Sequence, residues 1–417
     1  MKKDTVTVMK AMRLYGKNDM RFEDLPIPAC GPGQVLVKTL FCGVCGSDPP
    51  RVLDGAIRIS PAALGHEFSA IVVETGEDVG DAGGANDINN TAGTGSVNGD
   101  GNTNNAGGGK DACNVGGADG VIGVSSTNNT DGAGGVDNAG GLKPGDLVCC
   151  VPLIVCNACP NCMDGNYGQC VKSRFIGASF HDIGGFHEYN ALPAQNVFKL
   201  PEGMDPLAAA FMEPASVALH SLNLIGYQPH EDLAIVGVGG IGQLVLQCAR
   251  AMGGGRIFAF DKNERRLETA VKMGAAACFN TREDGFKERF LEYTAGLGSP
   301  QVIEAVGLEE TIILAATLAK VNGRIGIIGT MHEPVTLAPD IFYQVISRRQ
   351  LWLRGVWMSY SKGFPGAAWR LAARYLADRR INIQPLLFEV ATIEDAFLAI
   401  SQYNEPDNVT GKIVIKM

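Results

Sequence analysis

Residues 233–242 read LAIVGVGGIG and are the most informative segment for the fold of the second half of the chain. Leu233–Val236 is a short apolar run that predicts a buried strand, and a helical pattern follows from about residue 241 to residue 252. A strand, a glycine-rich turn and a helix in this order are typical of a loop that binds a dinucleotide.

The glycines of this loop have separate roles. Gly237 allows the tight turn, Gly239 lets the backbone approach a pyrophosphate, and Gly242 lets helix and strand pack closely. Asp261 stands nineteen residues after Gly242, at the end of the next predicted strand. A carboxylate there accepts hydrogen bonds from the ribose hydroxyls and repels a 2′-phosphate, which favours NAD over NADP. The expected cofactor contacts are Gly237, Gly239, Gly240, Ile241, Gly242 and Asp261.

Strands and helices alternate on both sides of this loop. Further apolar strands are predicted near residues 257–261, 277–280, 302–306, 324–328 and 351–356. With helical patterns between them, such as 264–273, they indicate a parallel sheet with helices on both faces. We assign residues 215–350 to this doubly wound, Rossmann-type domain. Arg265 and Arg266 could receive a 2′-phosphate, but on a helix we interpret them as solvated charges.

The first half of the chain is β-rich and irregular. Strand-forming runs at residues 35–37, 70–73 and 147–155 are separated by proline and glycine turns. We expect these runs to belong to a second domain over residues 1–214. Residues 351–417 would complete it, with a helix near 367–379 and a closing strand at 412–416.

The stretch from Gly80 to Gly141 differs in composition from the rest of the chain. Its 62 residues include 19 glycines and 11 asparagines and carry −6 of the net charge of −9. It has too little apolar surface to offset chain entropy, so we expect a disordered surface loop. The rest of the chain has a net charge of −3, without the excess of positive charge that nucleic-acid binding needs. No apolar run is long enough for a membrane helix. The N-terminus lacks the apolar core of a signal peptide, which favours a cytoplasmic protein.

Four of the twelve cysteines form one tight cluster. Their spacing is C-x2-C-x2-C-x7-C, and the residues are Cys156, Cys159, Cys162 and Cys170. Four thiolates on one short loop are typical of a structural zinc site without an open coordination position. Two disulfides are the alternative, and the two-residue gaps disfavour them. We interpret the 156–170 segment as a zinc lobe.

A second set of candidate metal ligands is spread over three segments. Cys45 lies in CGSD at 45–48, His66 and Glu67 lie in GHE at 65–67, and Glu213 precedes a proline. Three protein ligands with a fourth position left for water or substrate make a catalytic zinc site. Each residue alone has an ordinary structural interpretation, and their joint occurrence beside a nucleotide loop favours the metal site.

These motifs together resemble the zinc-dependent medium-chain alcohol and polyol dehydrogenases, over nearly the whole chain outside Gly80–Gly141. The resemblance implies an α/β fold with a β-rich, GroES-like catalytic domain and a Rossmann-type NAD-binding domain. It also implies two zinc ions per chain and a homodimer or homotetramer. Glu213 favours the polyol branch, since the alcohol dehydrogenases of the family use a cysteine there. Four further segments resemble members that oxidise phosphorylated hexitols: CGSDPPR at 45–51, CVPL at 150–153, FIG at 175–177 and WMSYS at 357–361.

Residue roles follow from this resemblance. Cys45 and His66 would hold the catalytic zinc with either Glu67 or Glu213, the other carboxylate lying one water away. Ser47 would relay the proton of the substrate hydroxyl. Two positions depart from the family pattern: Pro50 replaces the histidine that ends the relay in the alcohol dehydrogenases, and Ala70 replaces the glycine of Gly-His-Glu-x-x-Gly.

The substrate is the least determined feature. A sugar phosphate needs cationic contacts, and Arg51 and Lys362 are the candidates, with solvated surface charges as the alternative. An unphosphorylated polyol or vicinal diol such as sorbitol, xylitol or butanediol is the second candidate substrate. A non-catalytic NAD-binding relative is a distant alternative, which the complete set of candidate catalytic residues disfavours.

Overall fold

The computed structural model describes residues 7–79 and 141–417. The second half of the chain forms a six-stranded sheet in which every neighbouring pair is parallel. The strands, in spatial order, are β13 (Ala277–Asn280), β12 (Ile257–Asp261), β11 (Leu233–Val236), β14 (Ser299–Glu304), β15 (Ala319–Ile327) and β16 (Trp352–Gly355). The predicted doubly wound fold is confirmed, and all six predicted strands are present.

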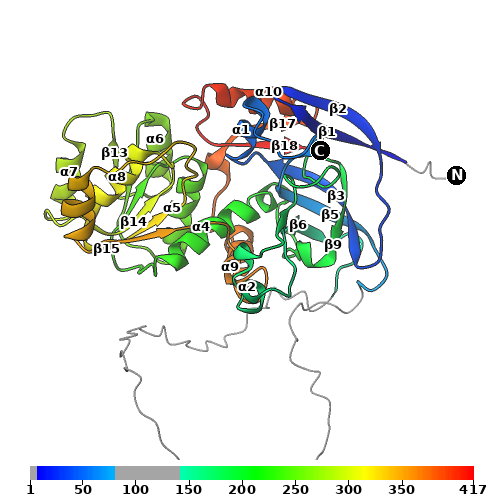
Figure 1. Ribbon diagram of the computed structural model, residues 1–417, viewed down its shortest axis with the longest axis horizontal. Coiled ribbons are helices and arrows are strands. Elements are labelled where there is room, and N and C mark those ends of the chain that lie inside the picture. Colours follow the sequence, from blue (N-terminus) through cyan, green and yellow to red (C-terminus); the bar gives the residue numbers. More distant parts are fainter. Residues whose placement is uncertain (1–6, 80–140) are drawn as a thin grey trace, which may run out of the picture. The chain divides into compact units, whose positions relative to one another are not determined.

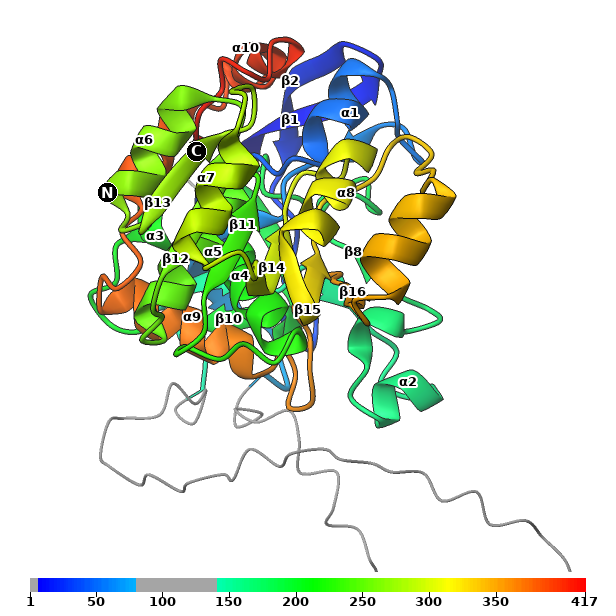
Figure 2. The same cartoon turned by 90° about the vertical axis from the view of Figure 1, so that its left-hand side faces the viewer.

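Helices cover both faces of this sheet (Figure 2). They are α5 (Gly240–Ala251), α6 (Glu264–Lys272), α7 (Phe286–Tyr293) and α8 (Glu309–Leu318). Side chains of a strand point alternately to its two faces. Leu233 and Ile235 of β11 accordingly join the core that contains Leu244 of α5. Ala234 and Val236 join the opposite core, with α7 and α8.

The β-rich half contains a seven-stranded sheet made from both ends of the chain. Its path is β10 (Val197–Lys199), β6 (Leu147–Cys150), β5 (Glu67–Thr75), β3 (Gln34–Gly43), β18 (Lys412–Lys416) and β17 (Leu387–Thr392), with β9 (Tyr189–Pro193) also pairing with β3. The last strand, β18, lies between β3 and β17 (Figure 1). The C-terminus of the described chain therefore completes a sheet begun near its N-terminus.

Smaller elements surround this sheet. A three-stranded sheet contains β2 (Asp19–Pro26), β1 (Val8–Gly16) and β4 (Ala62–Ala63), and β7 (Leu153–Ile154) pairs with β8 (Arg174–Phe175). The helices are α1 (Asp48–Leu53), α2 (Pro160–Met163), α3 (Pro206–Ala209), α4 (Met212–Leu224), α9 (Ala367–Ala377) and α10 (Ala396–Ser401). Short helical turns are η1 (Tyr167–Gln169), η2 (Ala194–Asn196), η3 (Ile341–Ser347), η4 (Gln384–Leu386) and η5 (Gln402–Asn404).

Several element boundaries differ from the sequence prediction. The single run expected at 147–155 is divided into β6 and β7 around Pro152, which has no N–H for a strand ladder. The strand expected at 324–328 starts earlier, at Ala319. β16 lies just beyond the proposed domain boundary at residue 350, yet it pairs with β15 in the six-stranded sheet. The division into domains otherwise stays a proposal.

The glycine- and asparagine-rich stretch, Gly80–Gly141, lies almost wholly outside the described residues. The prediction that it is disordered therefore also concerns residues outside the described part of the chain. Its flanks are described: β5 and β6 are antiparallel neighbours, with Ser69 paired to Cys149. The stretch therefore connects two adjacent strands of the sheet. Within residues 7–79 and 141–417, we find no helix with the length and apolar character needed to cross a membrane.

Candidate metal centres and nucleotide site

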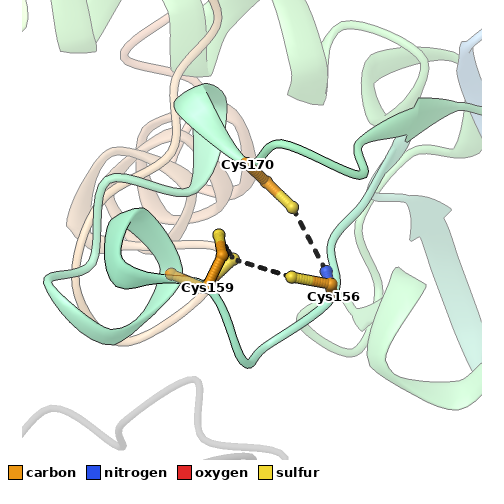
Figure 3. Close-up of side chains that lie close together, drawn as sticks. Cys156, Cys159 and Cys170 are labelled. Atoms are coloured by element: carbon orange, nitrogen blue, oxygen red, sulfur yellow. Dashed lines mark hydrogen bonds between the residues drawn. The ribbon is translucent and has the colours of Figure 1, made fainter.

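The four clustered cysteines converge in a lobe built from α2, η1 and their connecting loops. Their sulfur atoms all lie within 4.8 Å of one another, and Figure 3 shows three of these side chains pointing into one space. The Sγ atoms of Cys159 and Cys162 are 3.5 Å apart, and those of Cys156 and Cys162 are 4.0 Å apart. A disulfide needs about 2.05 Å. Thiolates about 2.3 Å from a tetrahedral zinc lie about 3.8 Å from one another, so the lobe fits zinc.

Backbone amides favour thiolates in this lobe. N–H groups of Val171 and Cys162 lower the pKa of Cys159 to about 6. The N–H groups of Ala158 and Cys159 likewise lower the pKa of Cys156. Burial, by contrast, raises the pKa of Cys162 to about 12. Because thiolates are the form that binds metal, the backbone favours a cation at two of the four cysteines, Cys156 and Cys159.

The second cluster forms where β3 and β5 run side by side. Cys45 lies in the turn between β3 and α1, and His66 immediately precedes Glu67, the first residue of β5. Glu67 is paired with Gly43 across the two strands. One ligand atom from each of Cys45, His66 and Glu67 lies within 4.8 Å of the other two. The structure thus brings together three residues that the sequence separates.

This donor set fits a divalent cation. His66 is buried, and its Nδ1 atom has no hydrogen-bond partner among the described residues. Burial, together with the nearby charge of Glu67, raises the pKa of the Cys45 thiol to about 12. When the Cys45 thiol and the Glu67 carboxyl are both ionised, the two buried negative charges need a positive charge to balance them. One sulfur, one imidazole nitrogen and one carboxylate are donors that zinc accepts.

Glu213 lies beside this cluster without joining the 4.8 Å group. It occupies the first turn of α4 and is 9% exposed. Burial, and then the charge of Glu67, raises the pKa of its carboxyl to about 7. Of the two candidate carboxylates, Glu67 is therefore the one that the structure places in the group with Cys45 and His66.

Lys412 is a member of the site that our sequence analysis missed. It is the first residue of β18, is buried, and forms an ion pair with Glu67 through Oε2. Gly43 makes room for this pair, because a Cβ atom there would lie 2.5 Å from Glu67 Oε2 and 2.8 Å from Lys412 Cε. The sequence shows only a lysine at a strand end, and the pairing depends on β18 docking beside β3.

Ser47, Asp48 and Arg51 form a hydrogen-bonded group at the start of α1. Asp48 is fully buried, and its Oδ2 accepts the Cys45 backbone N–H at 3.0 Å. Arg51 Nη1 donates to Asp48 Oδ1 and to Ser47 Oγ, both at 2.9 Å. Arg51, a candidate phosphate contact, is thus already engaged. Lys362, the other candidate, is exposed and packs against Gly165 of the cysteine lobe.

The glycine-rich loop has the geometry of a ligand cradle. Gly237 has a φ of +86°, and a Cβ atom at Gly242 would collide with the carbonyl oxygen of Gly237. At Gly239 and Gly240, by contrast, an added Cβ would meet no described atom within 4 Å. α5 begins at Gly240. Its N-terminus faces open space that a phosphate group can occupy.

Asp261 ends β12 beside this loop, with 7% of its surface exposed. Its Oδ2 accepts the Val238 N–H and its Oδ1 accepts the Asn263 N–H, both at 2.9 Å. Arg266 Nη1 lies 3.9 Å from Oδ1. The carboxylate is therefore held in place at the carboxyl end of the strand, where ligands of parallel sheets bind.

Comparison with known proteins identifies the family. The family model described as zinc-binding dehydrogenase matches residues 240–374. The model described as alcohol dehydrogenase GroES-like domain matches residues 31–126 and 109–202. The chain belongs to the zinc-binding dehydrogenase family. The resemblance, fold class and enzyme class predicted from the sequence are thereby confirmed, and this zinc-binding dehydrogenase is an oxidoreductase.

Individual relatives of this dehydrogenase include polyol-related enzymes. Galactitol 1-phosphate 5-dehydrogenase from Escherichia coli K12 is 30% identical, with 92% of each chain covered. The probable D-xylulose reductase A of Aspergillus niger is 26% identical, covering 93% of this chain and 92% of the relative. The crystal structure of galactitol-1-phosphate dehydrogenase from Escherichia coli superposes with a TM-score of 0.79 at 28% identity, covering 98% of this chain and all of the other.

Proposed function

We propose that this dehydrogenase oxidises a secondary hydroxyl of a polyol phosphate to a ketone and transfers the hydride to NAD. The observation that carries the proposal is the convergence of Cys45, His66 and Glu67, with a buried imidazole nitrogen that makes no hydrogen bond to a described residue. The phosphorylated substrate class is supported by the relative that acts on galactitol 1-phosphate, which matches over 92% of both chains.

In this mechanism, three side chains would hold a zinc ion and a fourth would transfer a proton. Cys45, His66 and Glu67 would hold a zinc ion, which lowers the pKa of an alcohol that it coordinates. Oxidation releases the hydroxyl hydrogen as a proton and the carbon-bound hydrogen as a hydride, which NAD accepts. Ser47 Oγ would accept this proton while its own hydroxyl proton moves on. Arg51, which is hydrogen-bonded to Ser47, has no acceptor atom, so the released proton passes to water.

The other residues orient this machinery. Asp48 fixes the Cys45 turn by accepting its backbone N–H, and Lys412 holds Glu67. The loop from Gly237 to Gly242 would bind the pyrophosphate of NAD, and Asp261 its adenosine ribose. In the cysteine lobe, the four thiolates would hold a second zinc that fixes the loop.

The substrate proposal is tested by NADH formation against a panel of free polyols and their phosphates. We expect the highest kcat/KM with a hexitol phosphate. A higher kcat/KM with free sorbitol or xylitol would favour an unphosphorylated polyol, the second candidate. That candidate is supported by the D-xylulose reductase relative and by the engagement of Arg51 with Asp48.

Replacing Arg51 with alanine tests its contact with the phosphate. Both hydrogen bonds of Arg51 use Nη1, and its side chain keeps 22% of its surface exposed. Losing the hydrogen bond to Ser47 should slow the oxidation of phosphorylated and free substrates to the same extent. Losing a phosphate contact should raise KM only for the phosphorylated substrate, by about ten-fold or more. Arg58→Ala, at an exposed arginine seven residues further along the chain, is the control. An unchanged ratio of the two KM values in Arg51→Ala would refute the contact.

We also propose that two copies associate through β16. This strand is an edge of the six-stranded sheet, and all four of its residues are exposed. Trp352 is 72% exposed, and Phe342 and Tyr343 of the neighbouring η3 are 56% and 60% exposed. An exposed apolar strand edge is a template for pairing with another chain. Light scattering should give twice the chain mass for the wild type and one chain mass for Trp352→Lys. A monomeric wild type would contradict the proposal.

A further inference from the structure

A pocket of about 340 Å³ is lined in part by Lys262, the residue that follows Asp261, and our mechanism assigns no role to the charged groups of its lining. It lies where β12 and β13 end, since Lys262 follows the last residue of β12 and Asn280 is the last residue of β13. The charged residues of its lining are Lys262, Glu264, Arg265, Arg282 and Asp407. In a parallel sheet, this end of the strands is the position of a bound nucleotide.

Asp407 is the unusual member of this lining. It follows η5 and precedes β18, so it comes from the chain segment that completes the β-rich half. Its Oδ1 lies 3.1 Å from Lys262 Nζ, and its Oδ2 lies 3.4 Å from Arg282 Nη2. The Asp407 carboxylate therefore forms ion pairs with two of the three cationic side chains of the pocket. Lys262 and Arg282 lower the pKa of this carboxyl.

The backbone around Asp407 is fixed to the nucleotide-binding half. Asn263 Nδ2 donates to the carbonyl oxygen of Asp407 at 2.6 Å. Arg266 Nη2 donates to the carbonyl oxygens of Pro406 and Val409, at 2.7 and 2.8 Å. Three hydrogen bonds thus hold the segment against the start of α6. The carboxylate of Asp407 is presented to the pocket by an anchored segment, although its side chain is half exposed.

We propose that Asp407 is a second coenzyme-specificity residue, which acts with Asp261 to exclude the 2′-phosphate of NADP. The inference rests on the proposed use of NAD. Lysine and arginine side chains around an adenosine ribose are the groups that recognise a 2′-phosphate. Here Asp407 pairs with Lys262 and Arg282, so these two cations are not free to bind a 2′-phosphate. NAD has only a hydroxyl at this position and needs no such cation.

The test is coenzyme binding to the full-length, zinc-loaded enzyme carrying Asp407→Asn. Titrations with NADH and NADPH, followed by nucleotide fluorescence, give both dissociation constants without turnover. We expect the dissociation constant for NADPH to fall about ten-fold, as for removal of one charge near the surface, and that for NADH to change less than about three-fold. Adding Arg282→Ala to Asp407→Asn should reverse most of the gain.

Two controls keep the result interpretable. Asp378 pairs with Arg374 on α9 and has the same side-chain exposure as Asp407, 49%, so Asp378→Asn should leave both constants unchanged. Asp407→Glu keeps the charge and should keep the discrimination. If Asp407→Asn binds NADH normally and NADPH no better than the wild type, the inference is wrong. It is also wrong if the wild type already prefers NADPH. If the wild type binds neither nucleotide, the proposed function itself fails.

Discussion

Replacing Cys45 with serine is expected to abolish turnover while leaving NADH binding intact. The Cys45 sulfur is one of three donor atoms that lie within 4.8 Å of one another, and a serine hydroxyl does not ionise to replace a thiolate ligand. The backbone of the turn should keep its shape, because Asp48 holds it through the Cys45 N–H and not through the sulfur. We expect kcat/KM to fall by at least about a thousand-fold, the scale of losing a catalytic centre.

Three measurements on Cys45→Ser separate a lost site from a lost fold. Zinc content should fall by one ion per chain, the dissociation constant for NADH should stay within about three-fold of the wild-type value, and circular dichroism should be unchanged. Cys30→Ser is the matched control, because Cys30 is a half-buried cysteine whose sulfur contacts the Gln34 carbonyl oxygen. Activity close to that of the wild type in Cys45→Ser would refute the mechanism.

Replacing Lys412 with methionine is expected to destabilise the metal-free protein strongly and the zinc-loaded protein much less. Lys412 is the partner of Glu67, and both side chains are buried. Removing one member of a buried ion pair leaves an uncompensated charge, at a cost of about 3 kcal/mol or more in the free energy of unfolding. A bound zinc supplies an opposing charge at Glu67, so the loss should shrink when the metal is present.

Urea unfolding of chelator-treated and zinc-loaded samples measures this difference. Lys416→Met is the control, because Lys416 lies in the same strand but is exposed. Activity of the zinc-loaded Lys412→Met enzyme should also fall, by about ten-fold or more, since a residue that orients a metal ligand is lost. Equal destabilisation with and without zinc would show that Lys412 has only a structural role.

The nucleotide-binding half is predictable because its signals are local. β11, β12 and β13 have the bounds that the apolar runs predict, and the glycine loop lies between β11 and α5 as its spacing requires. A short buried parallel strand carries its pattern within four or five residues. Asp261 is found at the end of β12, where a fixed spacing from the loop puts it.

The β-rich half is less predictable because its site depends on long-range strand pairing. The run at 412–416 predicts β18 correctly, but only the pairing of β18 with β3 brings Lys412 to Glu67. Arg51 is predicted as a phosphate contact or a solvated charge, and the sequence pattern alone did not reveal its ion pair with Asp48, three residues earlier. The role of Asp407 could not be predicted from the sequence for the same reason as that of Lys412. Its partners Lys262 and Arg282 come from another part of the chain.

The choice between Glu67 and Glu213 shows a similar limit. In the sequence, Glu67 adjoins His66, whereas Glu213 lies 146 residues later and comes just before a proline. Only the folded chain, in which β3 pairs with β5, shows Glu67 grouped with Cys45 and His66. Glu213 enters from α4 and stays close enough for Glu67 to raise the pKa of its carboxyl. Glu213 would be a further carboxylate available to a zinc ion held by Cys45, His66 and Glu67.

We infer that this chain binds two zinc ions, one in the cysteine lobe and one at Cys45, His66 and Glu67. Elemental analysis of the purified full-length protein, set against its concentration from amino-acid analysis, counts these ions. We expect two zinc ions per chain in the wild type and one in Cys45→Ser. One zinc ion in the wild type, unchanged in Cys45→Ser, would contradict this inference.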